Sequence, residues 1–243
     1  MFEINNVSYT ISDTGKKIFE GLNLTVPANE TVTIIGLSGS GKTTFLKIAA
    51  GLTEPTTGSV NIDGFNFTKA NKNQKYKIRQ RMGFMFQDIA LISNLNVYDN
   101  IALPLRYHTG LSEKEIFDKI DNWINMADLQ KNIYCLPPEL NISQKKIVAL
   151  IRAIIYSPKY LFLDEPTSNL DFYHKDIIKQ ILEQIKNNKT TIVMTTNNLK
   201  WATELTDRFV VLADGKIAVC GKYENICLAP NAKEIIKNIG GGE

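Results

Sequence analysis

Thr31-Val32-Thr33-Ile34-Ile35 runs directly into Gly36-Leu37-Ser38-Gly39-Ser40-Gly41-Lys42-Thr43 in this chain of 243 residues. The first segment is apolar and rich in β-branched residues, which is typical of a buried strand. The second matches the pattern G-x-x-x-x-G-K-[ST] at every position, and we expect a helix from Lys42 to about Ala50. A strand, a glycine-rich turn and a helix in this order form the setting in which that pattern cradles phosphates. The sequence therefore predicts a phosphate-binding loop in an α/β fold.

Most residues of this loop are candidates for contact with a nucleoside triphosphate. Its glycines let backbone N–H groups curl around the phosphates, and the following helix adds a partial positive charge at its N-terminus. We expect Lys42 to reach the β- and γ-phosphates and the Thr43 hydroxyl to ligate magnesium. The competing interpretation, a glycine-rich loop that binds nothing, is disfavoured by the complete match. The residues assigned to the nucleotide are Gly36, Ser38, Gly39, Ser40, Gly41, Lys42, Thr43 and Thr44.

A second part of the site is predicted where the apolar run Tyr160-Leu161-Phe162-Leu163 ends in two acids. Asp164 ends this predicted strand, where we expect it beside the phosphate loop as a magnesium ligand. Glu165 follows in a position to polarise an attacking water. Two ordinary surface acids are the competing interpretation. The continuation Pro166-Thr167-Ser168-Asn169-Leu170-Asp171 completes a longer pattern and favours the catalytic interpretation.

Short β-branched runs alternate with helical stretches along the chain, which predicts an α/β fold with a largely parallel central sheet. A mainly helical stretch from about Asn96 to Ser157 interrupts this alternation. We expect one domain, with a nucleotide-binding core of residues 1–87 and 158–243 and an inserted helical subdomain of residues 88–157. The glycine tail, residues 240–242, is expected to fray. Further strands are expected at 2–7, 59–62, 82–86, 161–163, 191–195, 208–213 and 216–220, and further helices at 173–186 and 233–238.

Composition and charge argue against some classes of protein. Hydrophobic residues make up 44% of the chain and charged residues 22%, as in an ordinary folded domain. The formal net charge of +3 is too small to indicate nucleic acid or anionic lipid as the main partner, so we expect no nucleic-acid partner. No apolar run approaches the roughly 20 residues that a membrane helix needs. A role at a membrane would therefore require docking on another protein.

At these motifs the chain resembles the ATP-binding cassette ATPases, the motor subunits of ABC transporters. The resemblance covers nearly the whole chain. Gly36–Thr43 matches their Walker A loop, and Leu163–Pro166 matches their Walker B motif with its catalytic glutamate. Gln87, after Phe84-Met85-Phe86, matches the Q-loop glutamine that contacts magnesium and the attacking water. Ser168–Asp171 matches the D-loop, where alanine is more common at the second place.

Several expectations follow from this resemblance. It implies a P-loop NTPase core with a mostly parallel sheet and an antiparallel β region near the N-terminus. It implies ATP and Mg²⁺ as cofactors, with Thr43, Gln87 and Asp164 as metal ligands and with Glu165 and Gln87 in catalysis. The partners would be a second ABC ATPase subunit, in a homodimer or heterodimer, and an integral membrane permease. The expected location is peripheral, on the cytoplasmic face of the inner membrane.

A narrower resemblance, to the Mla-type ATPases, lies in Leu95-Asn96-Val97-Tyr98-Asp99-Asn100-Ile101-Ala102-Leu103-Pro104-Leu105-Arg106-Tyr107-His108-Thr109 and in Leu111–Ile116 after it. Those ATPases drive lipid transport with MCE-domain proteins, which implies phospholipid or another lipid as cargo and an MCE-domain protein as a further partner. In ABC transporters this region forms the groove that receives the coupling helix of the membrane subunit. Many ABC ATPases share V-x-D-N-I here, so the narrower resemblance depends on the continuation at residues 103–109.

The chain departs from the family at the L-S-G-G-Q signature, which binds the γ-phosphate of ATP held by the opposing subunit. The matching residues are Leu140-Asn141-Ile142-Ser143-Gln144, and both glycines are missing. Glycine lets backbone N–H groups approach a phosphate closely, whereas Ile142 adds a branched side chain. Asn141 is a good N-cap residue, Ser143 offers a hydroxyl, and the helix N-terminus keeps its partial positive charge. We therefore keep Asn141, Ser143 and Gln144 as nucleotide-binding candidates.

A second departure concerns the switch histidine of the family. The V-x-x-T-H-D motif corresponds to Val193-Met194-Thr195-Thr196-Asn197-Asn198, which places Asn197 where histidine would contact the γ-phosphate. Asparagine donates a hydrogen bond but carries no charge and relays no proton. His108 and His174 lie elsewhere in the sequence and are expected to be surface or packing residues. Asn197 is thus a catalytic candidate whose side chain can contribute less to the reaction than a histidine would.

The residue that would stack on adenine is left open. Family spacing places it near Ile11, and Tyr9 lies two residues earlier, where it could point to the other face of its strand. The choice of ATP over GTP therefore depends on the resemblance alone.

Three functions remain open at this point. The first is a working ATPase subunit of a lipid transporter, with slow hydrolysis. The second is a hydrolysis-deficient nucleotide-binding partner that serves as the regulatory or structural half of a heterodimer. The third, a soluble ABC protein of translation or DNA repair, is disfavoured because such proteins usually carry two cassettes or long inserts. Glu165 favours the first, whereas the changes at 140–144 and at Asn197 favour the second.

Overall fold

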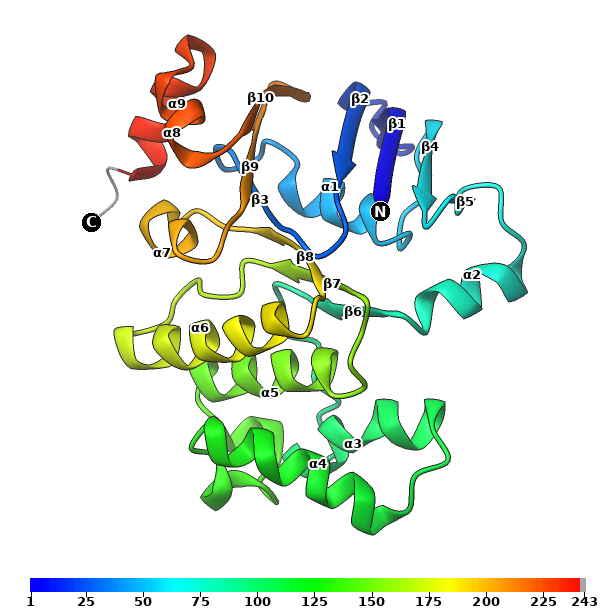
Figure 1. Ribbon diagram of the computed structural model, residues 1–243, viewed down its shortest axis with the longest axis vertical. Coiled ribbons are helices and arrows are strands. Elements are labelled where there is room, and N and C mark those ends of the chain that lie inside the picture. Colours follow the sequence, from blue (N-terminus) through cyan, green and yellow to red (C-terminus); the bar gives the residue numbers. More distant parts are fainter. Residues whose placement is uncertain (241–243) are drawn as a thin grey trace.

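The computed structural model describes residues 1–240, which form two β-sheets with helices around them (Figure 1). The first sheet is antiparallel, and its strands in spatial order are β2 (Lys17–Val26), β1 (Phe2–Thr10), β4 (Thr57–Ile62) and β5 (Phe65–Asn66). The second has the order β10 (Lys216–Gly221), β9 (Arg208–Ala213), β3 (Thr31–Ile35), β8 (Thr191–Thr195), β7 (Tyr160–Asp164) and β6 (Met82–Met85). All its neighbouring strands are parallel except β9 and β10. The predicted α/β fold with a mostly parallel sheet and an N-terminal antiparallel region is confirmed.

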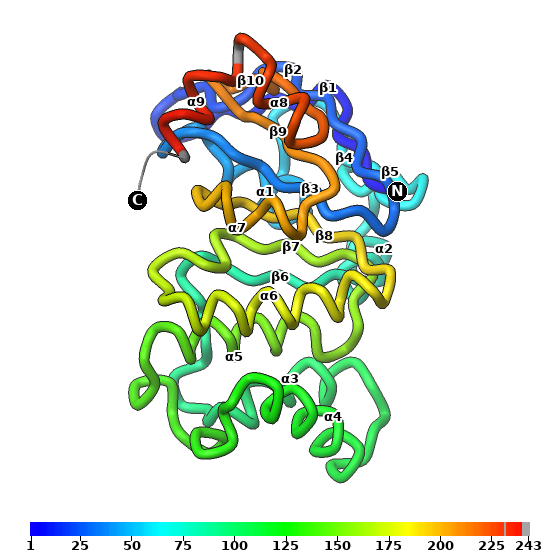
Figure 2. Tube along the Cα trace, turned by 60° about the vertical axis from the view of Figure 1, so that its left-hand side comes forward, coloured from blue at the N-terminus to red at the C-terminus, as the bar shows by residue number. Residues whose placement is uncertain are grey.

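The helices pack on both faces of the parallel sheet. The described helices are α1 (Lys42–Ala49), α2 (Lys72–Arg79), α3 (Val97–His108), α4 (Glu113–Met126), α5 (Ile142–Ile154), α6 (Phe172–Asn187), α7 (Leu199–Thr203), α8 (Tyr223–Leu228) and α9 (Pro230–Gly240). Helix α1 lies between the two sheets, α5 and α6 cover the opposite face, and α3 and α4 lie beyond α5 (Figures 1 and 2). Short 3₁₀ turns at Gln130–Asn132 and Pro137–Glu139 lead into α5.

The central strands are buried on both faces, which explains their unbroken apolar runs. Alternate residues of β7 enter different cores. Leu161 and Leu163 pack with the α5 and α6 side, and Tyr160 and Phe162 pack with α1 and the antiparallel sheet. Each core covers one face of the sheet. The edge at the carboxyl ends of the strands is not covered by either core, and functional side chains can lie there.

The parallel register aligns the carboxyl ends of three neighbouring strands. Thr195 of β8 lies opposite Ile34 of β3 on one side and opposite Asp164 of β7 on the other. The loops that follow these strands, which begin at Gly36, Glu165 and Thr196, therefore leave the sheet at the same edge. This register is what brings together the sequence motifs that lie far apart in the chain.

Most predicted elements are present with bounds shifted by a few residues at most. The predicted strands at 31–35, 191–195 and 208–213 match β3, β8 and β9, and the predicted helix at 173–186 is α6 with one residue more at each end. Residues 88–157 hold α3, α4 and α5, and their assignment as an inserted helical subdomain stays a prediction. Gly240, the first residue of the tail predicted to fray, is the last residue of α9, and Gly241 and Gly242 lie outside the described residues. The elements missing from the prediction are β2, β5, α2, α7 and α8.

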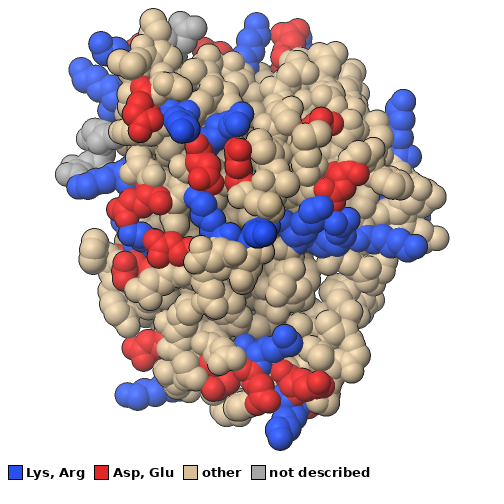
Figure 3. Space-filling view, viewed as in Figure 1, with Lys and Arg blue, Asp and Glu red and all other residues tan. Residues whose placement is uncertain are grey.

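The surface carries both signs of charge. On the face shown in Figure 3, Lys and Arg side chains form a band across the middle, with Asp and Glu above and below it. Among the described residues, no helix is both long enough and apolar enough to cross a bilayer.

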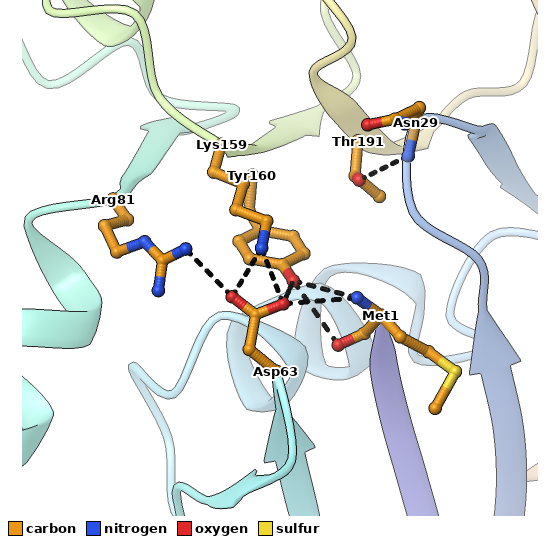
Figure 4. A network of polar contacts seen from close by, with 7 residues as sticks. All are labelled: Met1, Asn29, Asp63, Arg81, Lys159, Tyr160 and Thr191. Carbon is orange, nitrogen blue, oxygen red and sulfur yellow. Dashed lines mark hydrogen bonds and ion pairs between the residues drawn. The ribbon is translucent and has the colours of Figure 1, made fainter.

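Asp63, just after β4, ties the antiparallel sheet to the beginning of β7 (Figure 4). Its carboxylate accepts hydrogen bonds from the Tyr160 hydroxyl at 2.5 Å, from Lys159 at 2.7 Å and from the Met1 amine at 3.3 Å, and it lies 3.0 Å from Arg81. Burial opposes ionisation of this carboxyl, but the hydrogen bonds from Lys159, Tyr160 and the Met1 amine outweigh it. The pKa of Asp63 is therefore held well below its usual range.

We expect Asp63→Asn to lower the free energy of unfolding at neutral pH by about 1–3 kcal/mol, because the donors around it lose a charged acceptor. The depressed pKa means that the contribution of Asp63 is complete above the unfolded value of about 3.9 and is lost as the pH falls toward the folded value. Urea unfolding of parent and variant should therefore differ more at about pH 7 than at about pH 3. Asp118→Asn, at an exposed acid on α4, is the control and should match the parent. Equal stability of Asp63→Asn and the parent at neutral pH would refute this role.

Candidate functional site

Residues 36–41 connect β3 to α1 in a loop that requires glycine at two places. Gly41 precedes α1 with a φ of 95°, and a Cβ there would lie 2.8 Å from the ring of Phe19. A Cβ on Gly36 would lie 2.4 Å from the carbonyl oxygen of Leu212. The first N–H groups of α1 have no partner within the helix and can donate to an anion. The loop can therefore bind a phosphate with main-chain hydrogen bonds and the helix dipole.

The side chain of Lys42 lies over this loop. Its Nζ donates to the carbonyl oxygens of Gly36 at 2.9 Å and Leu37 at 3.2 Å, and the residue is only 8% exposed. Burial lowers the pKa of Lys42, whereas the nearby carboxylates of Glu165 and Asp164 oppose that shift. The ammonium thus lies between the loop and the two acids, as a phosphate-binding lysine requires.

The oxygen atoms predicted to hold magnesium meet at Asp164. Its Oδ1 accepts hydrogen bonds from the Thr43 hydroxyl at 3.1 Å and the Thr195 hydroxyl at 2.6 Å. Asp164 and Thr43 also line a cavity of about 420 Å³ together with Gln87. Hydroxyl, carboxylate and amide oxygens are the hard donors that Mg²⁺ takes in proteins. The residues present therefore fit a magnesium ion that also binds the phosphates of a nucleotide.

Glu165 has a strained main chain directly after Asp164. Its φ of 50° lies in the left-handed region, which residues with a side chain adopt rarely and mostly at functional sites. Its N–H donates to the Thr195 hydroxyl at 3.0 Å, and its carboxylate accepts a hydrogen bond from the N–H of Asn197 at 3.3 Å. Burial raises the pKa of Glu165, and Lys42 and the Asn197 N–H partly offset this. A buried carboxyl with a raised pKa is suited to accept a proton from water near neutral pH.

The contact to Asn197 comes from its main chain, and the residue is exposed. The two histidines lie away from this point. His174 pairs with Asp171 at the beginning of α6, and His108 lies beside Gln80 and Tyr76. Neither takes the place of the missing switch histidine.

The loop after Gln87 is held by two side chains from the helical region. Asn100 is fully buried, and its amide donates to the carbonyl oxygens of Ile92 at 3.0 Å and Leu95 at 2.8 Å. Arg152 of α5 donates to the main chain of the same loop. The asparagine of the D-N-I pattern therefore has a structural role, because Asn100 fixes the loop that follows Gln87.

Residues 141–144 form a capped helix end. The Asn141 side chain accepts a hydrogen bond from the Gln144 N–H at 2.9 Å, and the Gln144 side chain accepts one from the Asn141 N–H at 3.0 Å. This reciprocal cap confirms Asn141 as the N-cap of α5. Ser143 is only 6% exposed, whereas Ile142 is 48% exposed. Among the described residues, no hydrogen bond joins residues 141–144 to residues 36–44, so the chain does not bring these two predicted parts together.

A second cavity, of about 650 Å³, opens beside the outer part of the phosphate loop. Leu37–Ser40 line one side of it, and Lys16–Ile18 and residues of α9 line others. Tyr9 and Ile11 are absent from its lining, and Tyr9 packs against the core between the sheets. The contribution of Lys16–Ile18 and α9 was not predicted. Gly15, which marks the turn between β1 and β2, is the sequence feature that could have located the first of these segments.

We expect Gly41→Ala to weaken ATP binding at least about ten-fold, because its Cβ would collide with Phe19 and shift the first turn of the phosphate-binding helix. Gly64→Ala is the matched control. Gly64 also has a positive φ, of 78°, but a Cβ there meets nothing within 4 Å. Alanine strains the backbone in both variants, but only Gly41→Ala adds a collision at the phosphate loop. A weaker ATP affinity in Gly41→Ala alone, measured by titration, is therefore due to that collision. Equal ATP affinities of the two variants would contradict the assignment of the loop.

Comparison with known proteins agrees with this geometry. Residues 19–168 match the family model described as ABC transporter. The chain is 34% identical over 238 residues to the methionine import ATP-binding protein MetN of Francisella tularensis subsp. holarctica, an alignment that covers 96% of this chain and 67% of that protein. It is 33% identical over 223 residues to the probable ribonucleotide transport ATP-binding protein mkl of Mycobacterium tuberculosis, with 91% and 62% covered. The chain thus spans about two thirds of the length of these relatives.

Solved structures with the same fold point to the same family. The dimeric ATP-binding cassette MJ0796, bound to ADP and Pi in a post-hydrolysis state, superimposes with a TM-score of 0.85 at 30% identity, covering 91% of this chain and 98% of that one. The cbiO1 protein of Clostridium perfringens, part of the ABC transporter complex cbiONQ, superimposes with a TM-score of 0.80 at 25% identity, covering 98% and 94%. The chain belongs to the ABC transporter family and is one of its ATP-binding ATPase cassettes.

Proposed function

We propose that this cassette drives lipid transport through a membrane permease, with slow hydrolysis of ATP. Two ATPase subunits would close around ATP, hydrolysis would open them, and the permease would follow that movement. The observation that carries the proposal is the arrangement of Glu165, whose buried carboxylate lies beside the Thr43–Asp164 pair and the Lys42 ammonium. A chain that only bound nucleotide would have no need of such a carboxylate.

In this proposal the chain's own residues bind the triphosphate and place the water. The loop N–H groups and Lys42 hold the phosphates, and Thr43, Asp164 and Gln87 would hold magnesium, which supplies positive charge against the phosphate oxygens. Glu165 orients the attacking water and accepts its proton. Gln87 lines the same cavity as Asp164, and Asn100 holds the loop that follows Gln87 through Ile92 and Leu95.

The slow rate follows from two features of the site. The N–H of Gln144 is taken by the Asn141 side chain, so one donor at the beginning of α5 is unavailable to an opposing phosphate. Asn197 contributes its main chain to Glu165 but has no imidazole to place against the γ-phosphate. Loss of one preorganised donor typically costs on the order of 10²–10³ in rate. Asn141, Ser143 and Gln144 would therefore bind the partner's nucleotide weakly.

Cargo and location are inferred from the narrower sequence resemblance. The stretch from Leu95 to Thr109 is similar to the Mla-type ATPases, which supports a lipid cargo and an MCE-domain protein in the assembly. Two relatives are instead named for methionine import and for ribonucleotide transport. The permease would place the chain peripherally on the cytoplasmic face of the cell membrane.

We expect the protein with its permease to release phosphate from ATP slowly but above background. Glu165→Gln should abolish this release, because the carboxylate that accepts the proton of water is lost. Asn197→His should raise the rate about ten-fold or more, since a donor is restored at the γ-phosphate. Phosphate release at saturating Mg-ATP measures all three proteins.

The absence of ATP hydrolysis would favour the second function, a hydrolysis-deficient nucleotide-binding partner. If the parent matched background and Glu165→Gln changed nothing, the chain would be the nucleotide-binding regulatory or structural half of a heterodimer. ATP titration of Glu165→Gln is the control, because its affinity should stay close to that of the parent.

The cargo is tested with the permease that co-purifies with the chain. Reconstituted into vesicles, the complex should move a labelled phospholipid between membranes only with ATP. The same complex carrying Lys42→Ala is the control for ATP dependence. ATP-driven uptake of methionine or a ribonucleotide, without movement of phospholipid, would reject the lipid cargo.

A further inference from the structure

Lys146 is a buried lysine in the helix that begins at Asn141. It is 3% exposed and lies in the first part of α5, among mainly apolar residues that pack under the sheet. A buried ammonium is unfavourable unless its donors and its charge are compensated. Its Nζ donates to the carbonyl oxygen of Glu165 at 2.9 Å, to the carbonyl oxygen of Ser168 at 2.8 Å and to the Ser168 hydroxyl at 2.6 Å. The three donors of the ammonium thus all bind one loop, residues 165–168.

The main chain has an unusual conformation at the first residue of this loop and at the residue directly after it. Glu165 has a φ of 50° and Asn169 a φ of 59°, and such conformations persist only where the surroundings impose them. The Ser168 hydroxyl, which accepts from Lys146, itself donates to the carbonyl oxygen of Glu165 at 3.1 Å. Thr195 binds the N–H of Glu165 at 3.0 Å. Glu165 is therefore fixed by Thr195 on its amide side and by Lys146 and Ser168 on its carbonyl side.

We propose that Lys146 is a positioning residue for hydrolysis, which holds the main chain of Glu165 so that its carboxylate points toward Asn197. Lys146 acts through Glu165, so the inference rests on the proposed catalytic role of that residue. The contact also joins α5 directly to the hydrolytic loop of the same subunit. A displacement of the Asn141 end of α5 is thereby passed to Glu165 through a single side chain.

Lys146→Met tests this in the protein assembled with its permease. The side chain stays unbranched and becomes one atom shorter, and it loses the donors and the charge of lysine. We expect kcat for ATP hydrolysis to fall about ten- to a hundred-fold, because the water-positioning group is displaced. KM for ATP should stay within about two-fold, since the phosphate loop is untouched, so the loss should fall on kcat and not on KM.

Lys186→Met is the matched control. Lys186 on α6 also donates to a main-chain oxygen, that of Leu205 at 3.1 Å, and it pairs with Asp207 at 2.8 Å, all outside the nucleotide site. It should leave kcat and KM for ATP as in the parent, whatever its effect on thermal stability.

Two results would overturn the role of Lys146. One is a parent-like kcat, and the other is a fall in kcat with a matching rise in KM for ATP, which a general loss of structure around the site would produce. Should Lys146→Met fail to fold by circular dichroism, Ser168→Ala removes one acceptor and the bridge to Glu165. It is expected to lower kcat about three-fold or more at constant KM, and an unchanged kcat would reject the inference.

Glu165→Gln separates this inference from the proposed function. Hydrolysis by Glu165→Gln at the parent rate would reject the catalytic role of Glu165 itself. Loss of hydrolysis in Glu165→Gln, with a parent-like Lys146→Met, would reject only the role of Lys146.

Discussion

The site depends on the buried carboxylate of Asp164 at the end of β7. It accepts hydrogen bonds from Thr43 in the first turn of α1 and from Thr195 at the end of β8, so one oxygen atom joins two strands and the phosphate-binding helix. In a buried setting these charge-assisted bonds are stronger than at the surface, and an unpaired carboxylate there would be costly. The parallel register that places Thr195 between Ile34 and Asp164 makes this contact possible. The phosphate loop and the acidic strand end form one site because of it.

Charge balance explains how two acids remain buried side by side. Asp164 and Glu165 are 1% and 7% exposed, and the ammonium groups of Lys42 and Lys146, at 8% and 3%, lie close to them. Lys42 comes from the nucleotide loop, whereas Lys146 comes from the helix capped by Asn141. The loop that begins at Glu165 is therefore flanked by a lysine from each face of the sheet. The departures at 141–144 act on the same helix, because the reciprocal cap stabilises α5 while it takes up a donor that a phosphate would use.

Sequence patterns were sufficient where function imposes strict residue types. The runs before Gly36 and before Asp164 predicted the strands β3 and β7, and the Thr43–Asp164 hydrogen bond brings the two motifs together. Helix α2 was not predicted because none of its residues is buried, so it has no apolar face, and a cap between Asn71 and Gln74 marks its beginning. Strand β2 was missed although Leu22, Leu24 and Val26 alternate with polar residues as a half-buried strand should.

The remaining parts of the site depend on contacts between distant segments. Two neighbouring lysines, Lys145 and Lys146, suggest a solvent-exposed position in the sequence. Only the helical spacing, which places Lys146 on the same face as the buried Ser143 and Leu150, indicates that its side chain is buried. The left-handed main chain of Glu165 has no sequence signature, since the tertiary contacts with Thr195 and Lys146 impose it. The cavity wall formed by α9 against Leu37–Ser40 likewise joins two ends of the chain that no local pattern relates.

The most direct measurement is the affinity for ATP, with magnesium present, of the parent and of Lys42→Ala. Lys42 is the one side chain of the loop that combines a positive charge with contacts to the loop's own carbonyl oxygens and proximity to both acids. We expect Lys42→Ala to bind ATP at least about ten-fold more weakly, because a buried cation at the phosphates is lost. An affinity equal to that of the parent would contradict the assignment of this edge of the sheet as the nucleotide site.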